Sequence, residues 1–118
     1  MSTTPESAQP LQQALSDEDR KLITLARAAR ARATSREGAA VRDDIGRTYA
    51  AAEVTLPSLR LTALQAAVAA AVSSGADRLE AAAVVTSNES VSAVDAAVVA
   101  DLGVTQVLFA GLDGVLRT

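Results

Sequence analysis

The feature that most constrains the fold is an uncharged, Ala-rich stretch in the middle of the chain, residues 61–72. It is shorter than the ~20 residues that a membrane-spanning helix needs, so we expect a buried helix and no membrane association. Ser58 is a suitable N-cap and Gly75 a suitable terminator, which predicts a helix from Leu59 to Ser74. A helix that is apolar on nearly all sides lies inside a protein or against another subunit. The sequence therefore predicts a homo-oligomer that forms through this helix.

The remaining segments alternate between helical and strand periodicity. A first helix is predicted after the N-cap Ser16, because acidic residues occupy its first turn and arginines lie near its end. Short apolar runs and turn signals predict the other elements: a hairpin over residues 38–54 with its turn at 44–46, a strand over 79–86, a helix over 91–102, a strand over 104–110 and a terminal edge strand within 111–118. This order, α-β-β-α-β-α-β with a further terminal β, indicates an α/β fold with helices packed on a mixed sheet.

The composition limits the core and the partners. Hydrophobic residues make up 49% of the 118 residues but aromatic residues only 2%, so the core consists mostly of Ala and Val. Such side chains bury little area each, which favours stabilisation by subunit association. We expect one domain over residues 16–118 and a disordered tail over residues 1–15, where Ser, Thr, Pro and Gln prevail. The net charge of −3 argues against nucleic acid as a partner, and the first residues lack a signal peptide, which predicts a cytoplasmic protein.

Histidine and cysteine are both absent from the chain. Without cysteine there is neither a disulfide framework nor a thiolate, and without histidine the commonest metal ligand and neutral-pH base is missing. Most zinc and nucleophile chemistry is thereby excluded, and we expect no cofactor.

Three stretches of the chain resemble the small zinc-dependent cytidine deaminases. They are the hairpin residues 38–41 with 44–49, the helix end at 71–75, and the strand residues 82–85 that lead into residues 90–92. In order and spacing they extend the resemblance from Ser16 to Gly114. The resemblance implies a three-layer α/β/α fold with a mixed sheet and two helices behind the active site.

The zinc-binding signature of these deaminases is not retained. It consists of a His or Cys, one further residue and a catalytic Glu at the start of one helix, and Pro-Cys-x-x-Cys at the start of the next. Counting back from the glycine that ends each helix, Thr62 stands at the first ligand and Leu64 at the catalytic Glu. Ser92 and Asp95 stand at the two cysteines. The resemblance implies that these four positions are vestigial, with no catalytic residue and no metal, because the mechanism needs Zn²⁺ to activate water.

Ser92 and Asp95 also have the spacing of a capping box, in which Ser92 accepts a hydrogen bond from the helix and Asp95 reaches back to the cap. This interpretation is favoured over a hard-cation site made with Thr62 and Glu53, because so few carboxylates hold Mg²⁺ or Ca²⁺ poorly. A self-capped helix would keep the fold without a metal.

We therefore expect a catalytically inactive cytidine deaminase-like protein with a structural, regulatory or protein-interaction role, and with another protein as a candidate partner. The alternative is a non-catalytic module that binds a nucleoside or a small anion. Glu53 and Thr55 lie where the family binds its nucleoside, and helix N-termini near Ser58, Thr62 and Ser92 would attract an anion. Glu53, Thr55 and Ser58 are thus the candidate ligand-binding residues.

Overall fold

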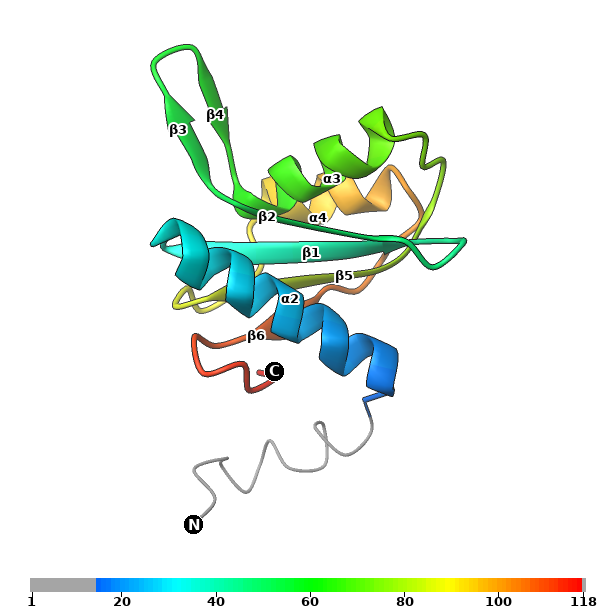
Figure 1. Cartoon of the computed structure of the whole chain (residues 1–118), viewed down its shortest axis with the longest axis horizontal. Coiled ribbons are helices and arrows are strands. Elements are labelled where there is room, and N and C mark those ends of the chain that lie inside the picture. The colour runs from blue at the N-terminus through cyan, green and yellow to red at the C-terminus, as the bar shows by residue number, and fades with distance from the viewer. Residues whose placement is uncertain (1–14, 118) are drawn as a thin grey trace.

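The computed structural model describes residues 15–117, whose arrangement is drawn in Figure 1. The elements are α2 (Asp17–Ala33), β1 (Glu37–Asp43), β2 (Thr48–Ala52), β3 (Val54–Leu56), β4 (Leu59–Leu61), α3 (Ala63–Ser73), β5 (Leu79–Thr86), α4 (Ala93–Ala100) and β6 (Leu108–Ala110). The tail predicted over residues 1–15 lies outside the described residues, apart from Leu15. No helix in the described part of the chain is long and apolar enough to cross a membrane.

Four strands form one mixed sheet in the order β2-β1-β5-β6. β1 runs antiparallel to β2 and to β5, whereas β5 and β6 are parallel. α2 covers one face of this sheet and α3 with α4 cover the other, so the molecule has three layers (Figure 1). The predicted α/β class with a mixed sheet between helices is confirmed.

The central strand β1 is buried along its whole length. Its side chains alternate between the two layers: Ala39 and Val41 pack in the cluster under α3, and Ala40 packs in the cluster under α2. Gly38 lies so close to α2 that an added Cβ would overlap the carbonyl oxygen of Ala26 and lie 2.8 Å from the backbone nitrogen of Arg30. The absence of a side chain at Gly38 therefore sets how closely α2 approaches the sheet.

The hairpin of β1 and β2, predicted from the turn at residues 44–46, is confirmed. Gly46 supplies the positive φ of 91° that the turn requires. The fully buried carboxylate of Asp43 accepts hydrogen bonds from the backbone nitrogens of Ile45 and Arg47 and from Arg47 Nε, at 3.1, 2.8 and 2.8 Å. Burial alone would raise the pKa of Asp43, but these bonds outweigh it and lower the pKa. The turn is thus held by an ionised side chain.

The helix predicted from Leu59 to Ser74, with Ser58 as its cap, starts too early and is corrected by the structure. α3 begins at Ala63, because Thr62 forms a complete capping box: Thr62 Oγ1 accepts from Gln65 N at 3.0 Å, and Gln65 Oε1 accepts from Thr62 N at 2.9 Å. Residues 59–61 instead form β4, which pairs with β3 in a separate two-stranded hairpin. Ser58 lies exposed in the turn of that hairpin. This hairpin projects from the body of the protein (Figure 1).

The other predicted elements are present, some of them shorter. Ser16 caps α2, and β5 has the predicted bounds. The helix predicted over residues 91–102 is α4, and the strand predicted over 104–110 is reduced to β6. The strand is shorter because Val104 still belongs to the turn that ends α4. Its backbone nitrogen donates a hydrogen bond to Val99 O at 3.0 Å. The terminal strand is a single bridge between Ala110 and Leu116.

Candidate functional site

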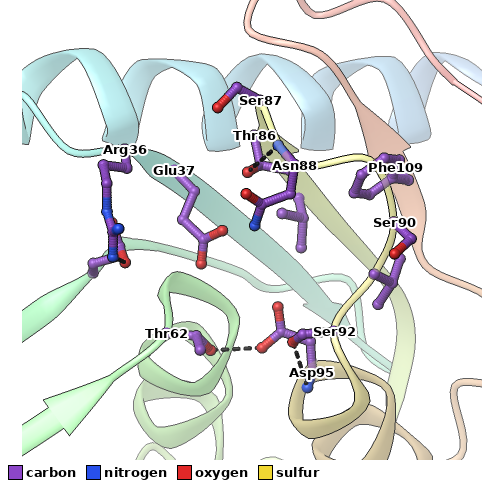
Figure 2. A pocket seen from close by; sticks show the side chains of 13 residues that line it. Arg36, Glu37, Thr62, Thr86, Ser87, Asn88, Ser90, Ser92, Asp95 and Phe109 are labelled. Carbon is purple, nitrogen blue, oxygen red and sulfur yellow. Dashed lines mark hydrogen bonds and ion pairs between the residues drawn. The ribbon is translucent and has the colours of Figure 1, made fainter.

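A cavity of about 390 Å³ opens where the N-termini of α3 and α4 meet the ends of β1 and β5. Its lining is mostly polar, with Val84, Val91 and Phe109 as the apolar members. Figure 2 shows the side chains of β1, α3, α4 and the loop after β5 facing this space from different sides. The volume lies in the range of small-molecule sites in proteins, and the lining is more polar than that of most such sites.

The floor of the cavity is a direct link between the two helix starts. Thr62 Oγ1 donates a hydrogen bond to Asp95 Oδ1 at 2.6 Å (Figure 2). Asp95 is only 4% exposed, so this short bond to a charged acceptor forms in a largely dehydrated place. It joins residues 33 positions apart in the sequence. The side chains of Thr62 and Asp95, two of the residues singled out in the sequence, are thus bonded to each other.

The capping box predicted for α4 is only half present. Ser92 Oγ accepts from Asp95 N at 3.2 Å, as expected for an N-cap. The Asp95 carboxylate, however, accepts from Thr62 on α3 instead of reaching back to the cap. The tertiary partner replaces the local one because the hydroxyl of Thr62 lies at hydrogen-bond distance from the buried carboxylate.

Glu37, the first residue of β1, brings a second nearly buried carboxylate to the cavity. It is 8% exposed, and its Oε1 accepts from the backbone nitrogen of Ala63 at 3.4 Å. Desolvation raises the pKa of Glu37, the negative charges of Asp95 and Glu53 raise it further, and hydrogen bonds to Ala63 and Thr86 offset part of this rise. Glu37 therefore holds a proton more readily than an exposed glutamate.

Glu53 closes one side of the cavity and is already paired. Its Oε2 lies 2.9 Å from Arg36 Nη2, and its Oε1 accepts from Ser35 Oγ at 3.3 Å. The Arg36 side chain is 88% exposed, so it reaches Glu53 from the solvent side. Arg36, the one arginine among the lining residues, thus forms an ion pair with Glu53.

The loop after β5 forms the opposite wall and is fastened by Arg117. Arg117 Nη2 donates to the carbonyl oxygens of Thr86, at 2.8 Å, and Asn88. The same guanidinium lies over the ring of Phe109, 4.9 Å from its centroid. The C-terminal segment thereby holds a wall of the cavity in position.

The structure brings together four of the seven residues singled out in the sequence: Thr62, Ser92, Asp95 and Glu53 line the cavity. Leu64 does not, because it is fully buried in the apolar cluster between α3 and the sheet. Thr55 and Ser58 lie exposed on the β3–β4 hairpin and are not among the lining residues.

Sequence reasoning missed Glu37, Arg36 and Asn88 as members of the lining. One signal could have identified Glu37: it is an acidic residue directly before the apolar run of residues 38–41 that forms the middle of a buried strand. An acid in that position must find donors or a cavity, because burying an isolated charge is costly.

The donor set does not suit zinc. Zinc sites in proteins use cysteine, histidine and carboxylate ligands, and the chain has no cysteine or histidine. Thr62, Ser92 and Asp95, which the resemblance matches to zinc ligands, offer two hydroxyls and one carboxylate, and the hydroxyl of Thr62 donates to that carboxylate. Over residues 15–117 no group of three or more His, Cys, Asp or Glu is arranged to hold a metal ion.

Comparison with known proteins gives a consistent result. Cytidine deaminase from Burkholderia pseudomallei has a similar solved structure, with a TM-score of 0.71 and 22% sequence identity over 87% of this chain and 91% of that one. No curated protein matches the sequence. A family model described as "Cytidine deaminase-like" matches residues 15–114, which is most of the chain. On these grounds the chain belongs to the cytidine deaminase-like family.

Proposed function

We propose that this protein is a catalytically inactive member of the family with a structural or protein-interaction role. The observation that carries the proposal is the bond of Thr62 Oγ1 to Asp95 Oδ1, which links two positions where the family signature has metal ligands. Zinc-dependent deamination needs an activated water and a carboxylate that moves its proton. Leu64, at the position of that carboxylate, is an apolar side chain in the core.

The test of inactivity is metal analysis of the purified chain together with the ultraviolet absorbance of cytidine and deoxycytidine. We expect no stoichiometric zinc and no change in absorbance. The triple variant Thr62→Cys, Ser92→Cys, Asp95→Cys is the matched control, because it restores three thiolates to one place and is expected to take up zinc. Turnover by the unmodified protein above background would overturn the proposal.

Association through α3 is the second part of the proposal. α3 carries no charged residue, and the one charge of α4, Asp95, is buried, so the outward sides of both helices are uncharged. Val72 on α3 and Val94 on α4 are 48% and 51% exposed. Both helices lie in the same outer layer, which supports a second copy of the chain as the partner.

Light scattering tests this association directly. The wild type is expected to have the mass of an oligomer, and Val72→Lys is expected to reduce it by burying a charge in the contact. Leu25→Lys is the matched control, because Leu25 is 36% exposed on α2, on the opposite layer. A wild-type monomer at micromolar concentration would contradict the proposed contact.

A second candidate function is non-catalytic binding of a small molecule, and the cavity itself favours it. Of the two ligand classes expected from the sequence, the nucleoside suits a site lined by five hydroxyls and three carboxylates better than the anion does. Glu37, Glu53 and Asp95 all contribute negative charge to the lining. Calorimetry against nucleosides separates the two functions, since a pure scaffold releases no binding heat.

A further inference from the structure

We propose that the cavity binds a small organic cation, an amine or guanidinium compound, between the carboxylates of Glu37 and Asp95. This inference rests on the proposal that the cavity is a binding site. Figure 2 shows the two carboxylates pointing into the same space, Glu37 from β1 and Asp95 from α4, with the Asn88 side chain nearby.

The first argument is charge. Among the residues described, neither Glu37 nor Asp95 forms a salt bridge, whereas Arg36 pairs with Glu53. Two nearly buried carboxylates, 8% and 4% exposed, therefore face one cavity without a salt bridge of their own, and the one cation among the described lining residues, Arg36, is bonded to Glu53 while its charge also acts on Glu37. Buried charges in proteins are normally paired, so a cation is the complementary occupant.

The second argument is the balance of donors and acceptors. An ionised carboxylate offers about four acceptor sites. Asp95 accepts from the hydroxyl of Thr62, at 2.6 Å, and Glu37 accepts from the amide of Ala63, at 3.4 Å, and from Thr86. Acceptor sites remain open toward the cavity, so a good ligand brings N–H donors. Ammonium and guanidinium groups consist of donors alone.

The third argument distinguishes an organic cation from a metal ion. No set of three acidic or other ligating side chains in the described chain is close enough to coordinate a metal. The cavity of about 390 Å³ is also much larger than a bare ion. A guanidinium or ammonium cation can instead contact Glu37 and Asp95 through separate N–H groups, with charge-assisted hydrogen bonds to each.

Cation binding must be linked to the protonation of Glu37. Its surroundings are Asp95 on α4, Glu53 after β2, the neighbouring Arg36, the amide of Ala63 on α3 and Thr86 on β5. Because burial and the two acids raise the pKa of Glu37, the side chain gains a proton more easily as the pH falls. A proton and a cation compete for the same carboxylate, so affinity rises as the pH is raised through that pKa.

The experiment is calorimetric titration of the full chain with methylguanidinium chloride, with propylammonium chloride and, as the anion probe, with sodium sulfate. We expect saturable heat from at least one cation and none from sulfate, and tighter binding at higher pH. Glu37→Gln keeps the shape of the side chain but removes its charge, and should weaken cation affinity about ten-fold or more, as expected for the loss of a charge-assisted bond. Glu18→Gln, on the exposed first turn of α2, makes the same chemical change away from the cavity and should leave affinity unchanged.

Three results would overturn the proposal: no saturable heat from either cation, tighter binding of sulfate than of cations, or an equal loss in both glutamine variants. The last result would mean that net charge alone drives the interaction. Zinc content and cytidine turnover are measured separately, so a failure of the inactive assignment is recognised independently of these titrations.

Discussion

The bond between Thr62 and Asp95 should contribute measurably to the stability of the fold. Thr62→Val removes two interactions, the 2.6 Å bond to the buried carboxylate and the N-cap bond from Gln65 N. A hydrogen bond to a charged group contributes about 1.5–3 kcal/mol, and an N-cap contributes about 1 kcal/mol. The variant should therefore lose about 2.5–4 kcal/mol of unfolding free energy. This is a large part of the ~5–15 kcal/mol that stabilises a typical domain.

A double-mutant cycle separates the bond from the cap. Asp95→Ala also breaks the bond, so adding it to Thr62→Val should cost less than the sum of the two single changes, by about 1.5–3 kcal/mol. The free energies come from urea unfolding followed by circular dichroism. Thr62→Ser keeps the hydroxyl and serves as the control, with a stability close to that of the wild type. A coupling energy below about 0.5 kcal/mol would refute the view that this bond holds the helix starts together.

Three further outcomes follow from the packing and the charges. Gly38→Ala should lower the free energy of unfolding, measured in urea, by about 3 kcal/mol or more, because the new Cβ would overlap the backbone of α2. Ala69→Gly, at an exposed position of α3, is the control and should have a smaller effect. Glu37→Gln should gain stability relative to the wild type as the pH rises. Folding raises the pKa of Glu37, so the folded wild type binds more protons than the unfolded chain does. The wild type therefore loses stability as the pH rises from the unfolded to the folded pKa, whereas the glutamine variant does not. A difference between these two proteins that does not change with pH would contradict this. Arg117→Ala should speed amide hydrogen exchange in residues 86–88 without changing exchange in β1, since it removes the bonds to Thr86 and Asn88.

Local signals in the sequence predicted much of the fold. Ser16 with its acidic first turn, the turn around Gly46 and the apolar run of β5 each specify an element within a few residues. The start of α3 was harder, because Ser58 and Thr62 are both good N-caps. The choice depends on β4, and a three-residue strand paired only with β3 has too little periodicity to be recognised.

The residues of the candidate site could be predicted only where their distance along the sequence from a helix end determines their position. The spacing of Thr62, Ser92 and Asp95 relative to the helix-ending glycines places these residues together at one cavity. The partner of Asp95 was not predictable, since a capping box is local and the bond to Thr62 spans 33 positions. Glu37 was missed for the same reason, because its burial depends on α3 and α4 covering the end of β1.

The link between Thr62 and Asp95 also bears on how the chain reaches its native state. Where a metal ion joins two helix starts, folding is coupled to metal capture and to the loss of ligand protons. Here the joining atoms belong to the chain itself, so closure of the intervening segment is a unimolecular event. On the proposed assignment without zinc, its rate is set by chain diffusion and loop entropy and not by an encounter with a scarce ion. Refolding of this protein should accordingly proceed at the same rate in the presence of a strong chelator.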